Sequence, residues 1–247
     1  MILRADLHNH SCLSPCGDLY NSPSRMVELA AQRGITMMAL TDHNSARNCP
    51  AFAVSCRRHG IFPVFGTETT TQEEIHVLSL FAEVEEALQW GEWVYQRLPD
   101  FHHDQERFGD QVVVDEDENI LDIEERYLIP GIDASIEEVA QETLRRGGLV
   151  IPAHIDRSAH SISSQLGFLP DTTFSALEVT RLPVEMDTRN HPLICSSDAH
   201  FPDDIARRWI TFPMEDSTGD PRQPFNALVR ALQEHTPALS IASGDPA

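Results

Sequence analysis

The sequence contains an ordered series of histidines and carboxylates whose side chains suit divalent-metal chemistry. Its nine members are His8, His10, Asp18, His43, Glu68, His76, His154, Asp198 and His200. Imidazole nitrogens and carboxylate oxygens both bind zinc, manganese or iron, and clustered ions of this kind promote hydrolysis. The series therefore predicts two or three divalent ions and a metal-dependent hydrolase. The alternative is a set of separate structural histidines.

The spacing of these residues places them at strand ends. His8 and His10 are two residues apart after the apolar run 2–7, so both rings lie on one face of a strand. Asp198 and His200 repeat this spacing after 192–195. Most other members also border short apolar runs. Ligands must converge to bind a metal, and strand ends on one edge of a sheet would bring them together.

The elements expected between these residues alternate between strand and helix. Helix-compatible apolar spacing covers 24–33, 46–59, 84–97, 135–146 and 225–234. Strand-like runs lie near residues 3, 38, 62, 78, 150, 177, 193 and 210. This alternation predicts parallel strands with crossover helices, and seven or eight strands favour a barrel over an open doubly wound sheet. In such barrels the catalytic groups lie at the carboxyl ends of the strands.

One segment interrupts the alternation. Residues 99–130 are predicted to be an insertion beside the pocket, with a hairpin of 111–114 and 120–123. Residues 1–235 are expected to form a single barrel domain, and 236–247 a flexible tail.

Charge and composition limit the expected partners. The 247 residues include 39 acidic and 18 basic side chains, which gives a formal net charge of -21. Because an acidic surface repels polyanions, we predict that duplex nucleic acid is not a partner. A small phosphorylated substrate is expected instead, and a short oligonucleotide is compatible with the same chemistry, since bound cations create a local positive field.

Composition also indicates the compartment. The chain has no charged leader before a long apolar stretch and no apolar run long enough to cross a bilayer, so no membrane association is expected. Five cysteines, an odd number, argue against a disulfide framework and favour the cytoplasm. Cys12 and Cys16 follow the first histidine pair. They are interpreted as ordinary thiols, because no second cysteine pair accompanies them.

All 18 basic residues are arginine, since the sequence contains no lysine. Hydrolases that bridge two metals with a carboxylated lysine are therefore excluded, and Glu68 is the natural bridge. Arg157, three residues after His154, is the first candidate for holding a phosphate, because its planar fork matches phosphate oxygens. Arg181 and Asn44 are further candidate substrate contacts. Asp42 is a candidate for orienting a ligand imidazole.

The motifs DLHNH, TDHN, PAHID and SDAH, with Asp18, Glu68 and His76 between them, resemble the PHP (polymerase and histidinol phosphatase) family. HSCLSPCGD and IPAHIDR resemble its stand-alone bacterial phosphoesterase branch. The resemblance runs from about residue 5 to 201. It implies a distorted (β/α)7 TIM-like barrel with three metal ions of zinc, manganese or iron.

By that resemblance, each of the three ions has its own ligand set. One ion would bind His8, His10, Glu68 and Asp198. A second would share Glu68 and bind His76 and His154, and the third would bind Asp18, His43 and His200. Glu68, Asp198 and His200 would act in catalysis through these ions, which would supply a bridging hydroxide that attacks a phosphomonoester or phosphodiester of a nucleotide, short oligonucleotide, sugar or histidinol.

Two other functions remain open. An amidohydrolase-like enzyme acting on a C–N bond also uses an HxH motif and a late Asp in a barrel. The absence of lysine and the presence of Glu68 count against it. A non-catalytic metal-binding module is the second alternative, and the presence of all nine predicted ligands counts against that interpretation.

Overall fold

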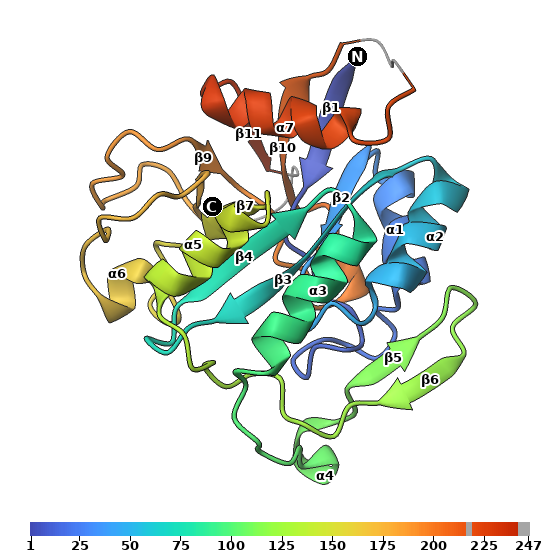
Figure 1. Ribbon diagram of the computed structural model, residues 1–247. Coiled ribbons are helices and arrows are strands. Elements are labelled where there is room, and N and C mark those ends of the chain that lie inside the picture. Colours follow the sequence, from blue (N-terminus) through green and yellow to red (C-terminus); the bar gives the residue numbers. More distant parts are fainter. Residues whose placement is uncertain (216–218, 242–247) are drawn as a thin grey trace.

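The computed structural model describes residues 1–215 and 219–241. Its main sheet has seven strands in the order β11-β10-β1-β2-β3-β4-β7 (Figure 1). In that order they are Ala238–Ile241, Arg208–Pro213, Ile2–Asp6, Met37–Leu40, Phe62–Thr70, His76–Phe81 and Leu149–Pro152. Two short pairs accompany the sheet. They are β5 (Val112–Val114) with β6 (Ile120–Ile123), and β8 (Leu177–Glu178) with β9 (Leu193–Ile194).

The described residues include seven α-helices and one 3-10 helix. The α-helices are α1 (Pro23–Gln32), α2 (Cys49–His59), α3 (Val84–Tyr95), α4 (Gln105–Phe108), α5 (Ile136–Arg145), α6 (Ile162–Gln165) and α7 (Gln223–Gln233), and the 3-10 helix is η1 (Pro202–Asp204). Five of them confirm the predicted helices within a few residues. In the fully described part of the chain, no helix combines the length and the hydropathy needed to cross a bilayer.

Local chemistry explains where the principal helices begin. The Ser22 hydroxyl accepts a hydrogen bond from the Arg25 amide, and Pro23 occupies the first turn of α1. At α5, Ser135 and Glu138 form a reciprocal capping box. Both helices pack apolar faces into the molecule, and helix α5 lies beside β4 and β7.

The sheet is mixed, which corrects the predicted run of parallel strands. Strands β1, β2 and β3 are parallel, whereas β4 runs antiparallel to both β3 and β7. Only five residues, 71–75, separate β3 from β4, which is too short for a crossover helix and produces a hairpin instead. The fold is therefore a mixed α/β fold with a curled sheet, and the described residues do not form a regular (β/α)7 repeat.

Hydrogen bonds extend the curled sheet from β7 back toward β1. The Ser175 amide donates to the Val150 carbonyl, and β8 then pairs in parallel with β9. After β9, the His10 amide donates to the Ala199 carbonyl. The segments that follow β1, β2, β7 and β9 consequently surround one end of the sheet.

The insertion contains the predicted hairpin, β5 and β6, together with the unpredicted short helix α4. Strand β5 contacts the loop after β1, because the Val112 amide donates to the Cys12 carbonyl. The Asn48 amide group also donates to the Val112 carbonyl, at 3.1 Å. The hairpin thus packs against the loop that carries the first histidine pair.

The predicted tail from residue 236 is wrong for residues 238–241. These residues form β11, which pairs antiparallel with β10. A short edge strand gains its stability from the partner strand, so its own composition gives little signal. Residues 242–247 of the predicted tail lie outside the described part.

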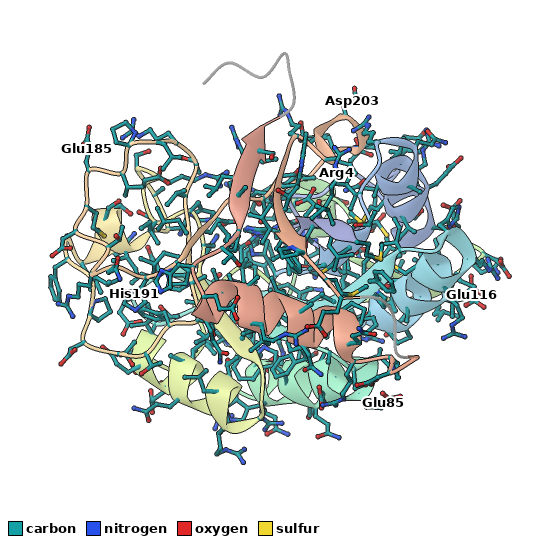
Figure 2. All side chains as sticks on the ribbon, turned by 90° about the horizontal axis from the view of Figure 1, so that it is seen from above. Arg4, Glu85, Glu116, Glu185, His191 and Asp203 are labelled. Atoms are coloured by element: carbon teal, nitrogen blue, oxygen red, sulfur yellow. The ribbon has the colours of Figure 1, made fainter. Side chains whose placement is uncertain are left out.

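Acidic side chains lie around the periphery of the molecule. Glu85, Glu116, Glu185 and Asp203 come from separate segments and lie on different sides in Figure 2. These four negative charges thus lie apart from one another, and the net charge alone does not determine the electrostatic field at any one site.

Candidate metal centre

Eight of the nine predicted ligands gather at one end of the sheet. His8 and His10 follow β1, His43 follows β2, Glu68 lies in β3 and His154 follows β7. Asp198 and His200 follow β9, and His76 begins β4. Because β4 is antiparallel to its neighbours, its first residue lies at the same end as the carboxyl ends of the parallel strands.

Glu68 lies at the centre of this cluster and is 1% exposed. Its Oε1 lies 3.2 Å from His8 Nε2, 2.9 Å from His76 Nδ1 and 3.1 Å from His154 Nε2. Its Oε2 lies 3.2 Å from both His10 Nε2 and His43 Nδ1. A single buried carboxylate therefore contacts imidazoles from five separate positions in the sequence.

Asp198 is the second carboxylate that contacts the histidines of the cluster. Its Oδ1 lies 3.2 Å from His8 Nε2, 3.3 Å from His10 Nε2 and 3.6 Å from His200 Nδ1. Asp198 and His154 adopt left-handed backbone conformations, with φ of 50° and 31°. Such conformations cost about 1–3 kcal/mol each and concentrate at functional sites.

Groups outside the predicted series hold the rings in place. Glu178 Oε2 accepts a hydrogen bond from His8 Nδ1 at 2.9 Å and from the His154 amide at 3.0 Å. His10 Nδ1 contacts the Ser14 hydroxyl at 3.0 Å, and that hydroxyl donates to Asp42 Oδ1 at 2.7 Å. Asp42 therefore orients His10 through Ser14, a more indirect route than the sequence suggested.

Glu178 was missed by the sequence analysis. It lies in β8 within the apolar run 176–179, and it is 2% exposed. A carboxylate inside a buried strand is costly unless it is paired, so its position among apolar residues was the available signal.

The charges in the cluster are strongly coupled. Burial opposes protonation of His8, but Asp198, Glu178 and Glu68 raise its pKa well above the ordinary value. Burial likewise opposes protonation of His10, while the adjacent carboxylates of Asp198 and Glu68 raise its pKa to about 9. In the metal-free protein, two imidazolium ions thus balance the carboxylates.

His43 and His200 take the neutral form, whereas Glu68 and Asp198 are ionised. Burial lowers the pKa of His43 well below its ordinary value and that of His200 to about 4, so both rings stay neutral. Burial raises the pKa of Glu68 and of Asp198, but the neighbouring histidines outweigh it and hold both pKa values well below the ordinary range. Neutral imidazoles beside ionised carboxylates are the forms that bind metal ions.

These residues fit divalent cations on two further grounds. His43 Nδ1 and Asp198 Oδ1 are buried without a hydrogen-bond partner, although each has an ionic neighbour at 3.2 Å. Three groups of side chains also have ligand atoms within 4.8 Å of one another. They are His8, His10, Glu68 and Asp198; His43, Glu68 and His76; and His10, Cys16, His43 and His200.

Asp18 is not a member of any of these groups, and its role as a metal ligand stays a prediction. Its Oδ1 instead accepts a hydrogen bond from the Tyr20 amide at 2.8 Å. Asp18 follows a tight turn, and its carboxylate caps the next turn. Cys16, two residues earlier, lies where Asp18 was expected.

The three predicted substrate contacts lie in different environments in the structure. Arg157 Nη1 lies 2.5 Å from Asp198 Oδ2, and its side chain is 41% exposed. Asn44 is fully buried, donates to the Leu128 and Pro130 carbonyls and accepts from the Thr70 amide, so its prediction as a substrate contact is wrong. Arg181 is exposed, and its backbone amide donates to Asp156. Its side-chain role stays a prediction.

The family model for the PHP domain matches residues 6–143, more than half of the chain. The chain therefore belongs to the PHP domain family. The match includes His8, His10, His43, Glu68 and His76, whereas the later candidate ligands lie beyond it. No curated protein matches the sequence.

Solved structures share the fold at low sequence identity. The lesion-specific endonuclease PfuEndoQ from Pyrococcus furiosus is 18% identical, with a TM-score of 0.66 over 98% of this chain and 58% of its own. Endonuclease Q in complex with a 27-mer duplex carrying an abasic lesion is 19% identical, with a TM-score of 0.69 over 95% of this chain and 57% of its own. A protein assigned as a metal-dependent phosphoesterase from Bifidobacterium adolescentis is 17% identical, with a TM-score of 0.55 over 79% and 87%.

The chain spans less than two thirds of the two endonuclease chains that it matches. These comparisons also correct the prediction that acidic charge excludes duplex nucleic acid. A protein of the same fold has been solved with a 27-mer DNA duplex at its active site. Net charge sums the whole surface, whereas binding depends on the field at the site, so the exclusion was wrong.

Proposed function

We propose that the protein is a metal-dependent phosphoesterase whose reaction takes place at the cluster around Glu68. The observation that carries this proposal is the contact of one buried carboxylate with five imidazoles. The family membership supports the same conclusion. We assign His8, His10, Glu68 and Asp198 to one ion, and Glu68, His76 and His154 to a second.

Bound divalent ions would polarise the phosphoryl oxygens and supply an activated water for in-line attack on phosphorus. The protein's own residues position that chemistry. Glu68 bridges the two halves of the cluster, and Glu178 and the Ser14–Asp42 pair fix the rings of His8 and His10. No covalent enzyme intermediate is required.

Arg157 supports a phosphate substrate. Its guanidinium group lies against Asp198 and is partly exposed, so the donors not used by Asp198 can bind phosphate oxygens. We propose a small phosphomonoester or phosphodiester as the substrate. A phosphodiester in nucleic acid is the second candidate, which the likeness to endonuclease Q supports.

Arg157→Ala tests the phosphate contact. Because a charge-assisted hydrogen bond contributes about 1.5–3 kcal/mol, we expect KM for the best phosphoester to rise about 10- to 100-fold at saturating metal. Steady-state kinetics would measure this change. Arg145→Ala is the matched control, because Arg145 is exposed on α5 and pairs with Glu142. An unchanged KM in Arg157→Ala would contradict the assignment.

Glu178→Gln tests the support of the first ion. The substitution retains the size of the side chain but removes the negative charge of the carboxylate that accepts the hydrogen bond from His8 Nδ1. Loss of such a partner lowers metal affinity by about 10- to 100-fold. Titration with a fluorescent chelator would measure the affinity, and circular dichroism would verify the fold. Wild-type affinity in the variant would exclude this role.

A substrate panel separates the candidate reactions. It contains nucleoside bisphosphates, sugar phosphates, histidinol phosphate, short oligonucleotides and a DNA duplex with an abasic lesion. We expect chelator-sensitive cleavage of a phosphoester. Turnover of an amide but of no ester would favour the C–N hydrolase, and bound metal without any turnover would favour the non-catalytic module.

A further inference from the structure

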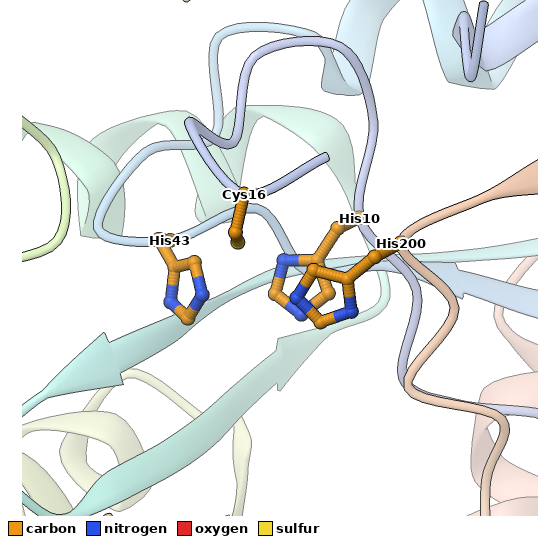
Figure 3. Close-up of side chains that lie close together, drawn as sticks. All are labelled: His10, Cys16, His43 and His200. Carbon is orange, nitrogen blue, oxygen red and sulfur yellow. The ribbon is translucent and has the colours of Figure 1, made fainter. Parts of the chain in front are cut away.

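We propose that Cys16 is a thiolate ligand in a third cation position of this cluster, beside His43 and His200, and that the thiolate makes this position selective for zinc. The proposal rests on the proposed function for the presence of the other ions. His10, Cys16, His43 and His200 have ligand atoms within 4.8 Å of one another. Figure 3 shows the Cys16 side chain between His43 and the stacked rings of His10 and His200.

The turn that carries Cys16 explains this position. Ser14, Pro15, Cys16 and Gly17 form a β-turn closed by the Gly17 amide and the Ser14 carbonyl, at 2.8 Å. Proline suits the second position of such a turn. A Cβ on Gly17 would lie 2.5 Å from the Ser11 carbonyl oxygen, so only glycine permits this close return of the chain.

Two contacts hold the turn against the cluster. The Asp18 amide donates to the His200 carbonyl at 2.8 Å, which ties the end of the turn to the segment after β9. The Ser14 hydroxyl donates to Asp42 and contacts His10 Nδ1. Cys16 is thus carried by a loop fixed at both ends.

The histidines offer the lone pairs that a third ion needs. His43 is 3% exposed, and its Nδ1 has no hydrogen-bond partner, although Glu68 Oε2 lies 3.2 Å away. His200 Nδ1 lies 2.9 Å from the Asp198 carbonyl, which accepts its N–H and leaves the Nε2 lone pair open. His10 also belongs to the group with Asp198 and His43 to the group with Glu68 and His76, whereas Cys16 and His200 belong to this group alone.

The donor set determines the class of metal. Thiolate and imidazole ligands suit zinc, whereas magnesium and manganese prefer oxygen donors. Coordination replaces the S–H bond with a metal–sulfur bond and releases one proton to solvent. With Asp18 as the ligand, this position would have an oxygen donor and would lack that preference.

Cobalt provides a spectroscopic test. Co²⁺ bound to thiolate gives a near-ultraviolet sulfur-to-metal charge-transfer band, so the fully Co²⁺-loaded protein should show this band. We expect the band to be absent in Cys16→Ser and unchanged in Asp18→Ala. The other four cysteines are buried and lie outside the group, which leaves Cys16 as the only thiol in it. A band that persists in Cys16→Ser would overturn the proposal.

Alkylation gives a second readout. Cys16 is the exposed cysteine, so iodoacetamide should modify it first in the native metal-free protein. We expect saturating Zn²⁺ to slow this modification by about tenfold or more, because the coordinated thiolate is a weaker nucleophile. Peptide mapping would locate the label. Equal rates with and without zinc would contradict coordination.

Metal counting separates this proposal from the proposed function. Zinc-loaded Cys16→Ser should lose one equivalent of zinc relative to wild type and to Asp18→Ala, with the other ions retained. Chelator-sensitive hydrolysis without a charge-transfer band would leave the phosphoesterase standing and refute the thiolate ligand. A charge-transfer band in a protein that hydrolyses no ester would support the thiolate ligand and refute the phosphoesterase.

Discussion

Glu68→Gln is expected to abolish metal-dependent turnover, with a fall in kcat/KM of at least about a thousandfold. Loss of a group that only supports a ligand costs about 10- to 100-fold in affinity or activity, and a carboxylate that bridges ions should cost more. The amide is similar in size to the carboxylate, but it cannot supply two anionic oxygens to the surrounding imidazoles.

Glu85→Gln is the control for this variant. It removes the same charge from an exposed position on α3, so it should retain wild-type turnover. Circular dichroism and metal content would accompany the kinetics. Turnover within a factor of about ten of wild type in folded Glu68→Gln would show that the bridging carboxylate is not required.

Metal affinity is expected to rise steeply with pH. In the metal-free protein the pKa of His10 is about 9, and the pKa of His8 is also raised well above its ordinary value. Only the neutral imidazole binds a cation, so the proton on His10 alone lowers the apparent affinity about tenfold for each pH unit below 9. The pKa values of His43 and His200 are lowered, so those rings release no proton.

Between pH 8 and pH 6 we therefore expect the affinity to fall by about 100-fold or more. Competition with a chelator of known pH dependence would measure the fall. Calorimetry in buffers of different ionisation enthalpy would count the released protons. Affinity that does not change with pH would contradict the protonation of His8 and His10.

The same pKa shift affects the metal-free fold in the opposite direction. A histidine whose pKa is raised on folding stabilises the native state fully below its unfolded pKa, and this contribution is lost as pH rises through the folded pKa. His10 thus stabilises the metal-free protein below about pH 6.5 and loses that contribution as pH rises toward 9. At the pH where His8 and His10 lose their protons, a bound cation would supply the positive charge that balances the carboxylates.

Much of the centre could be predicted from sequence because strand geometry determines it. His8 and His10 project from one face after β1, and Asp198 and His200 repeat the arrangement after β9. Along an extended chain, side chains two residues apart point to the same face. Because these strand ends meet at one end of the sheet, the cluster could be predicted without knowing where the helices lie.

Residues in turns were harder to predict. Asp18 and Cys16 are two residues apart in one loop, and their sequence spacing does not indicate which side chain reaches the cluster. In the structure, the turn that begins at Ser14 and the packing of Gly17 against Ser11 place Cys16 beside His43 and His200. Asn44 similarly belongs to a motif but uses its amide group to hold the backbone of the insertion.

Strand direction also depended on tertiary structure. The apolar runs of β3 and β4 marked both strands correctly, but the short turn between them required a hairpin. That hairpin explains why His76 lies at the start of its strand and still reaches Glu68.

The central claim is that the cluster around Glu68 hydrolyses phosphate esters with bound metal. The most direct test is phosphoester cleavage across the substrate panel by wild-type protein and Glu68→Gln, each with its metal content measured. We predict cleavage by the metal-loaded wild type that a chelator abolishes and that Glu68→Gln lacks. Metal-loaded wild type that cleaves no phosphoester, or cleavage that survives both the chelator and the substitution, would contradict it.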